Sequence, residues 1–155
     1  MKHWLIMVFI ALLTATAMTA CIDDVAYDHY EHTPLSGWEK NDTLFFYTHP
    51  IVKPGRYHAY IGLRTTVEFP FTSVNLLVEQ RTIPGNKKKT HTLKCKLMEK
   101  NGNINGQGVS FFQYEVPLAV LELHKGDSLQ FFIRHDMKRE ILPGIADVGL
   151  KLTRK

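Results

Sequence analysis

The stretch Tyr57–Thr66, "YHAYIGLRTT", indicates the fold class because apolar and polar side chains alternate along it. Every second position is apolar, and these positions are Tyr57, Ala59, Ile61 and Leu63. The intervening residues are polar or glycine. A period of two is typical of a β-strand that buries one face and exposes the other. The stretch therefore predicts a half-buried strand.

The same alternation recurs along most of the chain after Trp38. Further runs are "TLFFYT", "SVNLLVEQR", "HTLKCKLM", "VSFFQYEVPL", "DSLQFFIRH" and "IADVGLKL", most of them bounded by Gly, Pro, Asn or Asp. Only residues 119–124 and 136–142 leave room for helical turns. Many short strands separated by turn signals predict an all-β fold, namely an antiparallel β-sandwich or jelly-roll-like fold of seven or more short strands.

The first 20 residues have the layout of a cleaved lipoprotein signal peptide. Lys2 is followed by an uncharged apolar run and then by "MTAC", residues 18–21, which resembles a bacterial lipobox. This predicts cleavage before Cys21 and acylation of that cysteine, for example with palmitate, which binds the protein to a lipid membrane. The alternative is a transmembrane helix. The uncharged run of residues 4–22 is barely long enough, and no basic cluster follows it.

The predicted organisation has three parts. Residues 1–20 are the signal peptide, residues 21–36 are the lipidated cysteine and a flexible tether, and residues 37–155 are a single β-sandwich domain. The tether prediction rests on the lack of any sustained period in this charged stretch. Asp23 and Asp24 either resemble the export signal of surface lipoproteins in Bacteroidetes or keep the tether solvated, and both readings stay open.

Charge and cysteine content narrow the possible partners. Of the 19 Lys and Arg residues, 18 follow Cys21, as do all 15 acidic residues, so the mature chain has a formal charge of +3. This mild, dispersed excess predicts no nucleic-acid partner. With Cys21 acylated, Cys95 is the remaining thiol and no internal disulfide forms. Cys95 alternates with leucines, which predicts a buried structural thiol.

No catalytic or metal site, and no cofactor, is predicted. His29 and His32 lie three residues apart, but in a stretch without any helix signal, so they predict at most a weak adventitious zinc site. In "RHD", residues 134–136, strand alternation places His135 on the opposite face from its neighbours. No serine or cysteine stands in a nucleophile motif.

Two other kinds of site are candidates. Thr43 in "DTL" and Ser128 in "DSL" resemble O-glycosylation sites of exported Bacteroidetes proteins, although Asp and Ser are also ordinary turn residues. A surface that binds glycans needs several aromatic rings exposed together. The candidate platform is Tyr47, Tyr57, Tyr60, Phe112 and Tyr114.

Four stretches in order resemble the gliding-motility lipoprotein GldH family of Bacteroidetes. They are "YDHYEHTPLSGWEKNDTLFF", "YIGLRTTVEFPFTSVNLLV", "GNINGQG" and "REILPGIADVGLKL", and the last is the most specific. The chain departs from the family pattern at Arg64-Thr65 and at Phe69-Pro70-Phe71, where hydrogen-bonding groups are lost.

The resemblance implies a lipid-anchored protein of the cell envelope, at the outer membrane, facing either the periplasm or the exterior. It further implies protein–protein contact with other envelope motility or secretion proteins of the gliding and type IX secretion apparatus, without catalysis. The runner-up is a surface glycan-binding module. If the chain belongs to the GldH family, Trp38 is expected to pack the tether onto the sandwich. Arg64 either pairs with Asp147, in the expected Asp-Val-Gly turn, or contacts a partner.

Overall fold

The computed structural model describes residues 24–155, which form strands and no helix. The strands are β1 (Asp24–His32), β2 (Trp38–Glu39), β3 (Leu44–Tyr47), β4 (Gly55–Thr66), β5 (Ser73–Ile83), β6 (Lys87–Lys96), β7 (Phe111–Leu123), β8 (Ser128–His135), β9 (Ile141–Leu142) and β10 (Ile145–Arg154). Over this range no helix is long and apolar enough to cross a membrane. Residues 119–123, where a helical turn had room, belong to β7.

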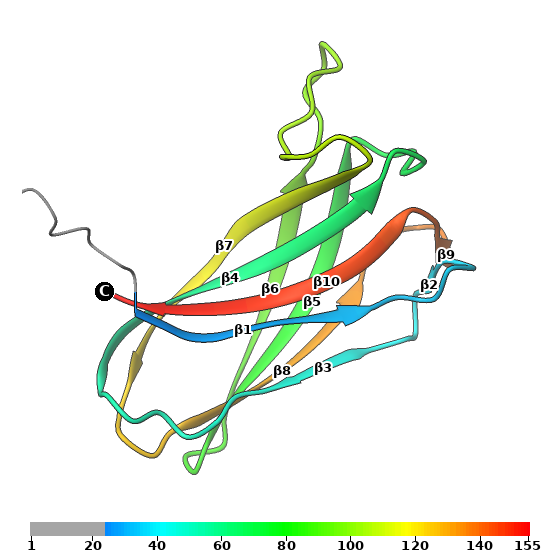
Figure 1. Ribbon diagram of the computed structural model, residues 1–155. Coiled ribbons are helices and arrows are strands. Elements are labelled where there is room, and N and C mark those ends of the chain that lie inside the picture. Colours follow the sequence, from blue (N-terminus) through cyan, green and yellow to red (C-terminus); the bar gives the residue numbers. More distant parts are fainter. Residues whose placement is uncertain (1–23) are drawn as a thin grey trace, which may run out of the picture.

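The strands form a sandwich of two four-stranded antiparallel sheets. One sheet has the order β1-β10-β4-β7 and the other β3-β8-β5-β6 (Figure 1). A two-stranded ribbon, β2–β9, lies at one end. The predicted all-β sandwich is confirmed, with antiparallel pairing throughout. β4, β5 and β7, with 12, 11 and 13 residues, are longer than the short strands expected.

Most strands contribute alternate residues to the core, as the period of two predicts, whereas β1 is largely exposed and β10 is buried at consecutive positions. In β4, Tyr57, Ala59, Ile61 and Leu63 are all buried, and Leu129, Phe131 and Ile133 of β8 face them from the second sheet. Cys95 is fully buried in β6, and its burial raises the pKa of the thiol to about 12. The prediction of a buried structural thiol is confirmed, since such a pKa keeps the thiol protonated and unreactive.

The prediction of a flexible tether is wrong for residues 24–32. This segment forms β1, which pairs with β10 from Asp24↔Arg154 to His32↔Asp147. The sheet therefore begins at Asp24 and not at residue 37. An edge strand is held by main-chain hydrogen bonds on one side, and most β1 side chains are exposed, so the sequence carries no alternation to reveal it. The signal peptide and Cys21 lie outside the described residues.

Tyr30 fixes β1 to the sheet. It lies over Gly62 of β4 and Gly149 of β10, which are directly paired. A Cβ atom at Gly62 would stand 2.4 Å from the Tyr30 hydroxyl, and one at Gly149 would stand 2.6 Å from the ring. Arg64 stacks on the ring, 4.1 Å from its centre. Because glycine has no side chain, Gly62 and Gly149 leave a slot in the sheet surface that larger residues would fill.

Trp38 and His135 close one end of the core. Both are buried, and their rings meet edge to face at 5.3 Å. His135 Nε2–H donates to the Trp38 carbonyl at 3.0 Å, and the Met137 N–H donates to His135 Nδ1 at 3.4 Å. These two bonds require the neutral imidazole. Trp38 thus packs inside the sandwich and not between a tether and the domain.

We expect stability to fall as pH drops below about 6.5, because burial lowers the pKa of His135 from its ordinary value of 6.5. At a pH between the lowered pKa of His135 in the folded chain and its ordinary pKa in the unfolded chain, the unfolded chain binds more protons. Acid therefore favours unfolding. Replacing His135 with Gln should reduce the loss of melting temperature between pH 7.5 and 5.5, and His91, whose pKa burial also lowers, contributes to the loss that is left. The exposed His124→Gln is the control; equal pH slopes in both variants would contradict the assignment.

A second prediction concerns the glycine slot. Gly149→Ala should lower the free energy of unfolding by about 1–3 kcal/mol, because the new methyl group overlaps the Tyr30 ring. Adding Tyr30→Ala to Gly149→Ala should recover part of this loss, and chemical denaturation of the four combinations measures the coupling. Gly85→Ala, whose nearest neighbour atom is 3.8 Å away, is the control. Strict additivity of the two changes would show that the slot does not hold Tyr30.

Candidate functional site

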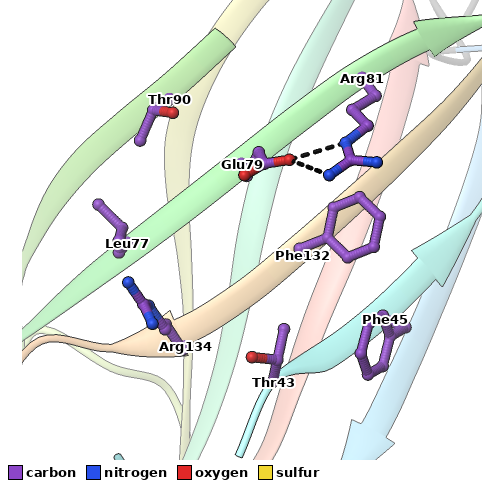
Figure 2. Close-up of a pocket in the computed structure, with 8 residues that line it drawn as sticks. All are labelled: Thr43, Phe45, Leu77, Glu79, Arg81, Thr90, Phe132 and Arg134. Atoms are coloured by element: carbon purple, nitrogen blue, oxygen red, sulfur yellow. Dashed lines mark hydrogen bonds and ion pairs between the residues drawn. The ribbon is translucent and has the colours of Figure 1, made fainter. Parts of the chain in front are cut away.

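The outer face of the β3-β8-β5-β6 sheet holds a groove of about 380 Å3. Its lining comes from all four strands and from the residue before β3: Thr43, Phe45, Leu77, Glu79, Arg81, Thr90, Phe132 and Arg134 (Figure 2). We call the whole outer face of this sheet, including the groove, the groove face. Because neighbouring strands are in register, the outward residues of each strand meet across the sheet.

Exposed aromatic rings form one side of the groove face. Phe45 and Phe132 are directly paired across β3 and β8, and their rings meet edge to face at 5.5 Å. Tyr47 contacts Phe132 in the same manner at 6.4 Å. The exposed fractions of Phe45 and Tyr47 are 50% and 56%. Large apolar rings exposed together on a sheet face indicate a binding surface.

Arg81 lies beside these rings in a fixed position. Its guanidinium stacks on Phe132 at 4.7 Å from the ring centre and pairs with Glu79 at 2.7 Å (Figure 2). Arg134 points into the same groove, and among residues 24–155 no ion pair engages it. Two arginines therefore border the aromatic rings, one already oriented and one with its donors available to a ligand.

The groove face is also the basic side of the sandwich. Register places five cations on it, Arg81, Lys88, Lys94, Lys96 and Arg134, against Glu79 and Glu99. The other sheet's outer face carries balanced ion pairs: Arg64–Asp147, Lys151–Glu115 and Arg56–Glu122. The field over the groove face is thus positive and attracts acidic groups.

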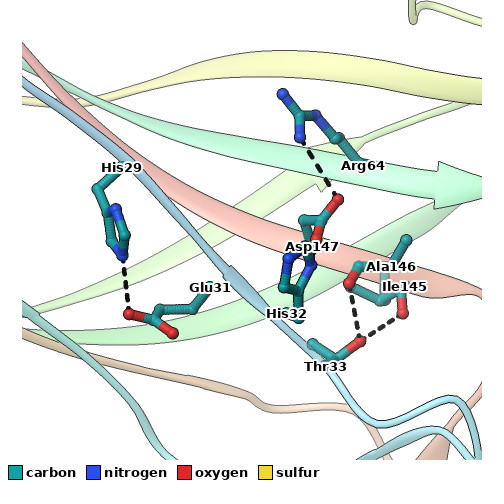
Figure 3. A network of polar contacts seen from close by, with 8 residues as sticks. All are labelled: His29, Glu31, His32, Thr33, Arg64, Ile145, Ala146 and Asp147. Carbon is teal, nitrogen blue, oxygen red and sulfur yellow. Dashed lines mark hydrogen bonds and ion pairs between the residues drawn. The ribbon is translucent and has the colours of Figure 1, made fainter.

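The predicted pair of Arg64 and Asp147 is brought together. An Arg64 nitrogen lies 3.6 Å from Asp147 Oδ2, and His32 Nδ1 contacts the other carboxylate oxygen (Figure 3). Asp147 belongs to β10, opposite Arg64 of β4, and not to a turn. Thr33 follows β1 and donates its hydroxyl hydrogen to the Ile145 carbonyl at 2.5 Å. Trp38 does not join this group.

The predicted aromatic platform is wrong. Tyr57 and Tyr114 are buried in the core, at 3% and 8% exposure. Phe112 is half-buried, Tyr60 lies on the outer face of the first sheet, and Tyr47 belongs to the second sheet. The five rings share no surface because adjacent strand residues face opposite sides and the strands divide between two sheets.

Sequence reasoning missed Phe45 and Phe132, although a signal was present. "LFFY" and "LQFFIR" each contain two consecutive phenylalanines. In a sandwich strand one of two neighbours faces outward. Phe46 and Phe131 are buried, so Phe45 and Phe132 are the outward members of the two pairs.

The remaining candidates occupy separate places. Thr43 lines the groove, whereas Ser128 begins β8, paired with Ile83. His29 pairs with Glu31 at 2.9 Å and His32 with Asp147. Across residues 24–155, no three His, Cys, Asp or Glu side chains converge as metal ligands.

The fold and the groove face define an all-β sandwich with one aromatic and basic sheet surface. The sequence model of the GldH lipoprotein family matches residues 25–152, so the chain belongs to this family. It is similar to the gliding motility lipoprotein GldH of Flavobacterium johnsoniae, with 23% identity over 153 residues covering 94% of this chain and 95% of that protein.

Solved structures with a similar architecture include a family GH115 4-O-methyl-alpha-glucuronidase, with 12% identity and a TM-score of 0.47. The match covers 90% of this chain and 19% of that one. Another is protein GEBA250068378 from Sulfurospirillum deleyianum, with 12% identity, a TM-score of 0.43, and coverage of 83% and 98%.

The Asp147 cluster generates a stability prediction. Asp147→Ala should lower the free energy of unfolding by about 1–2 kcal/mol, because it removes a mostly buried carboxylate that pairs with Arg64 and His32. Glu122→Ala is the matched control, since the exposed Arg56–Glu122 pair should contribute less than about 1 kcal/mol. Equal losses in urea denaturation would show that the cluster is no more than a surface pair.

Proposed function

We propose that the protein is a non-enzymatic lipoprotein of the cell envelope that acts by protein–protein contact through the groove face. Acylated Cys21 attaches it to the outer membrane, and its partners belong to the gliding motility and type IX secretion apparatus. The observation that carries the proposal is the ring cluster in which exposed Phe45 and Tyr47 meet half-buried Phe132 on a basic sheet face.

The residue types of the groove face support protein contact. Aromatic residues and arginine are enriched at the energetic centres of protein interfaces. Arg81 is held by Phe132 and Glu79 before any partner binds. A side chain already in place loses less conformational freedom on binding, which favours affinity.

The charge of the groove face indicates an acidic partner. Its five cations outnumber the nearby carboxylates, and complementary charge accelerates association. The similarity to the Flavobacterium johnsoniae protein supports placing that partner in motility. Family membership supports the lipid attachment.

Glycan binding is the second candidate, and one observation favours it. The partly exposed Phe45 ring stands near the hydroxyl of Thr43 and the guanidinium of Arg134 in a groove of about 380 Å3. Small-molecule sites commonly combine such a volume with a few polar groups.

The test is purification of the tagged, lipidated protein from its own envelope after chemical cross-linking, followed by mass spectrometry. We expect Phe45→Ala to reduce recovery of cross-linked envelope proteins at least tenfold, because about 1.4 kcal/mol of lost contact corresponds to tenfold in affinity. Val120→Ala is the matched control, an exposed apolar residue (56%) on the other sheet. Equal recovery from both variants would exclude the groove face, and a bound glycan lost only in Phe45→Ala would establish the second candidate.

A further inference from the structure

A set of segments far apart in sequence meets at the end of the sandwich where β1 begins. Ile51 N–H donates to the Asp127 carbonyl at 2.7 Å, and Gly126 N–H donates to the Ile51 carbonyl at 2.8 Å. Asp24 is paired with Arg154 in the sheet. We call the start of β1, residues 48–54, residues 124–127 and residues 154–155 the proximal end; Figure 1 shows the start of β1 beside the C-terminus.

Asp24 fixes this junction. Its carboxylate accepts a hydrogen bond from Lys53 Nζ at 3.0 Å, and Arg154 Nε lies 3.4 Å away. One side chain thus ties β1 to the loop before β4 and to the last strand. The main chain of Asp24 is also paired with Arg154, so the first residue of β1 has a defined place in the sandwich.

The distance from Cys21 to this junction is short. Only Ile22 and Asp23 separate Cys21 from Asp24. A fully extended chain covers at most about 3.6 Å per residue, so the two Cα atoms lie within about 11 Å of each other. The headgroup layer on one side of a bilayer is about 5–8 Å thick. With the acyl chain of Cys21 in the bilayer, the two residues before Asp24 are therefore too few to form a spacer between the membrane and the sandwich.

We propose that the proximal end rests on the phospholipid headgroups, so that the sandwich is held against the membrane surface without a flexible linker. The inference rests on the proposed acylation of Cys21. Phosphate groups of the lipids match the ammonium groups that border the junction, that of Lys125 and that of Lys53, which also donates to Asp24. Val52, 74% exposed beside Lys53, is the apolar side chain that enters the interface.

This placement also orients the groove face. The strands run away from the proximal end, and β4 with its 12 residues is about 35–40 Å long. Residues 67–72 and 97–110 form loops at the opposite end. The groove face runs along the side of the sandwich between the two ends, so it is offered to a partner standing beside the protein within this distance of the bilayer.

The test uses the acylated protein in vesicles of phosphatidylethanolamine and phosphatidylglycerol, with a nitrobenzoxadiazole label on a single introduced cysteine. Val52→Cys carries the label at the proximal end, and Val109→Cys, 88% exposed at the opposite end, is the matched control. Buried Cys95 stays unlabelled in the folded protein. We expect dithionite to reduce the label at position 52 at least tenfold more slowly than the label at position 109.

A second variant inserts twelve Gly and Ser residues between Asp23 and Asp24, which should restore rapid reduction at position 52. Equal rates at positions 52 and 109 without the insertion would overturn the inference. An unchanged slow rate of reduction at position 52 in the variant with the insertion would also overturn it. Flotation of the vesicles separates this from failure of the proposed function: if the acylated protein and its Cys21→Ser variant float equally, the anchor itself is wrong and the inference falls with it.

Discussion

The seating of Tyr30 on Gly62 and Gly149 is the contact on which the position of the N-terminal strand depends. Two paired glycines on neighbouring strands leave a flat floor, and the tyrosine ring fills it under the stacked guanidinium of Arg64. This contact adds side-chain packing to the main-chain pairing of β1 with β10. Without it the first strand would be an exposed edge held by main-chain hydrogen bonds and by ion pairs near its two ends, and such strands open readily.

The position of β1, which the Tyr30 contact holds, separates two surfaces of the protein: the end of the sandwich where β1 begins and the groove face. β1 brings the chain from the predicted lipid attachment to one end of the sandwich, where Asp24 joins it to Lys53 and Arg154. The groove face lies on the opposite sheet, which contains none of the strands that hold β1. The proposed attachment and the proposed partner surface therefore use different residues.

The sequence predicted the features that depend on alternation. The inward positions of β4 and the burial of Cys95 follow from a period of two. The proximity of Arg64 to Asp147 was expected from the family resemblance, with Asp147 placed in a turn, whereas the structure pairs the two residues across β4 and β10. β1 escaped prediction because an edge strand exposes most of its side chains. The groove face escaped because the doubled phenylalanines mark one outward ring in each strand, whereas the register that sets Phe45 opposite Phe132 is fixed by the fold.

The central claim is that the groove face contacts another envelope protein. The most direct measurement places a photo-crosslinking amino acid at Leu77, in the floor of the groove, and a second at Val120 on the other sheet, in living cells. The account predicts a discrete protein adduct from position 77 and none from position 120. Adducts from position 120 alone would place the contact on the β1-β10-β4-β7 sheet and contradict the account.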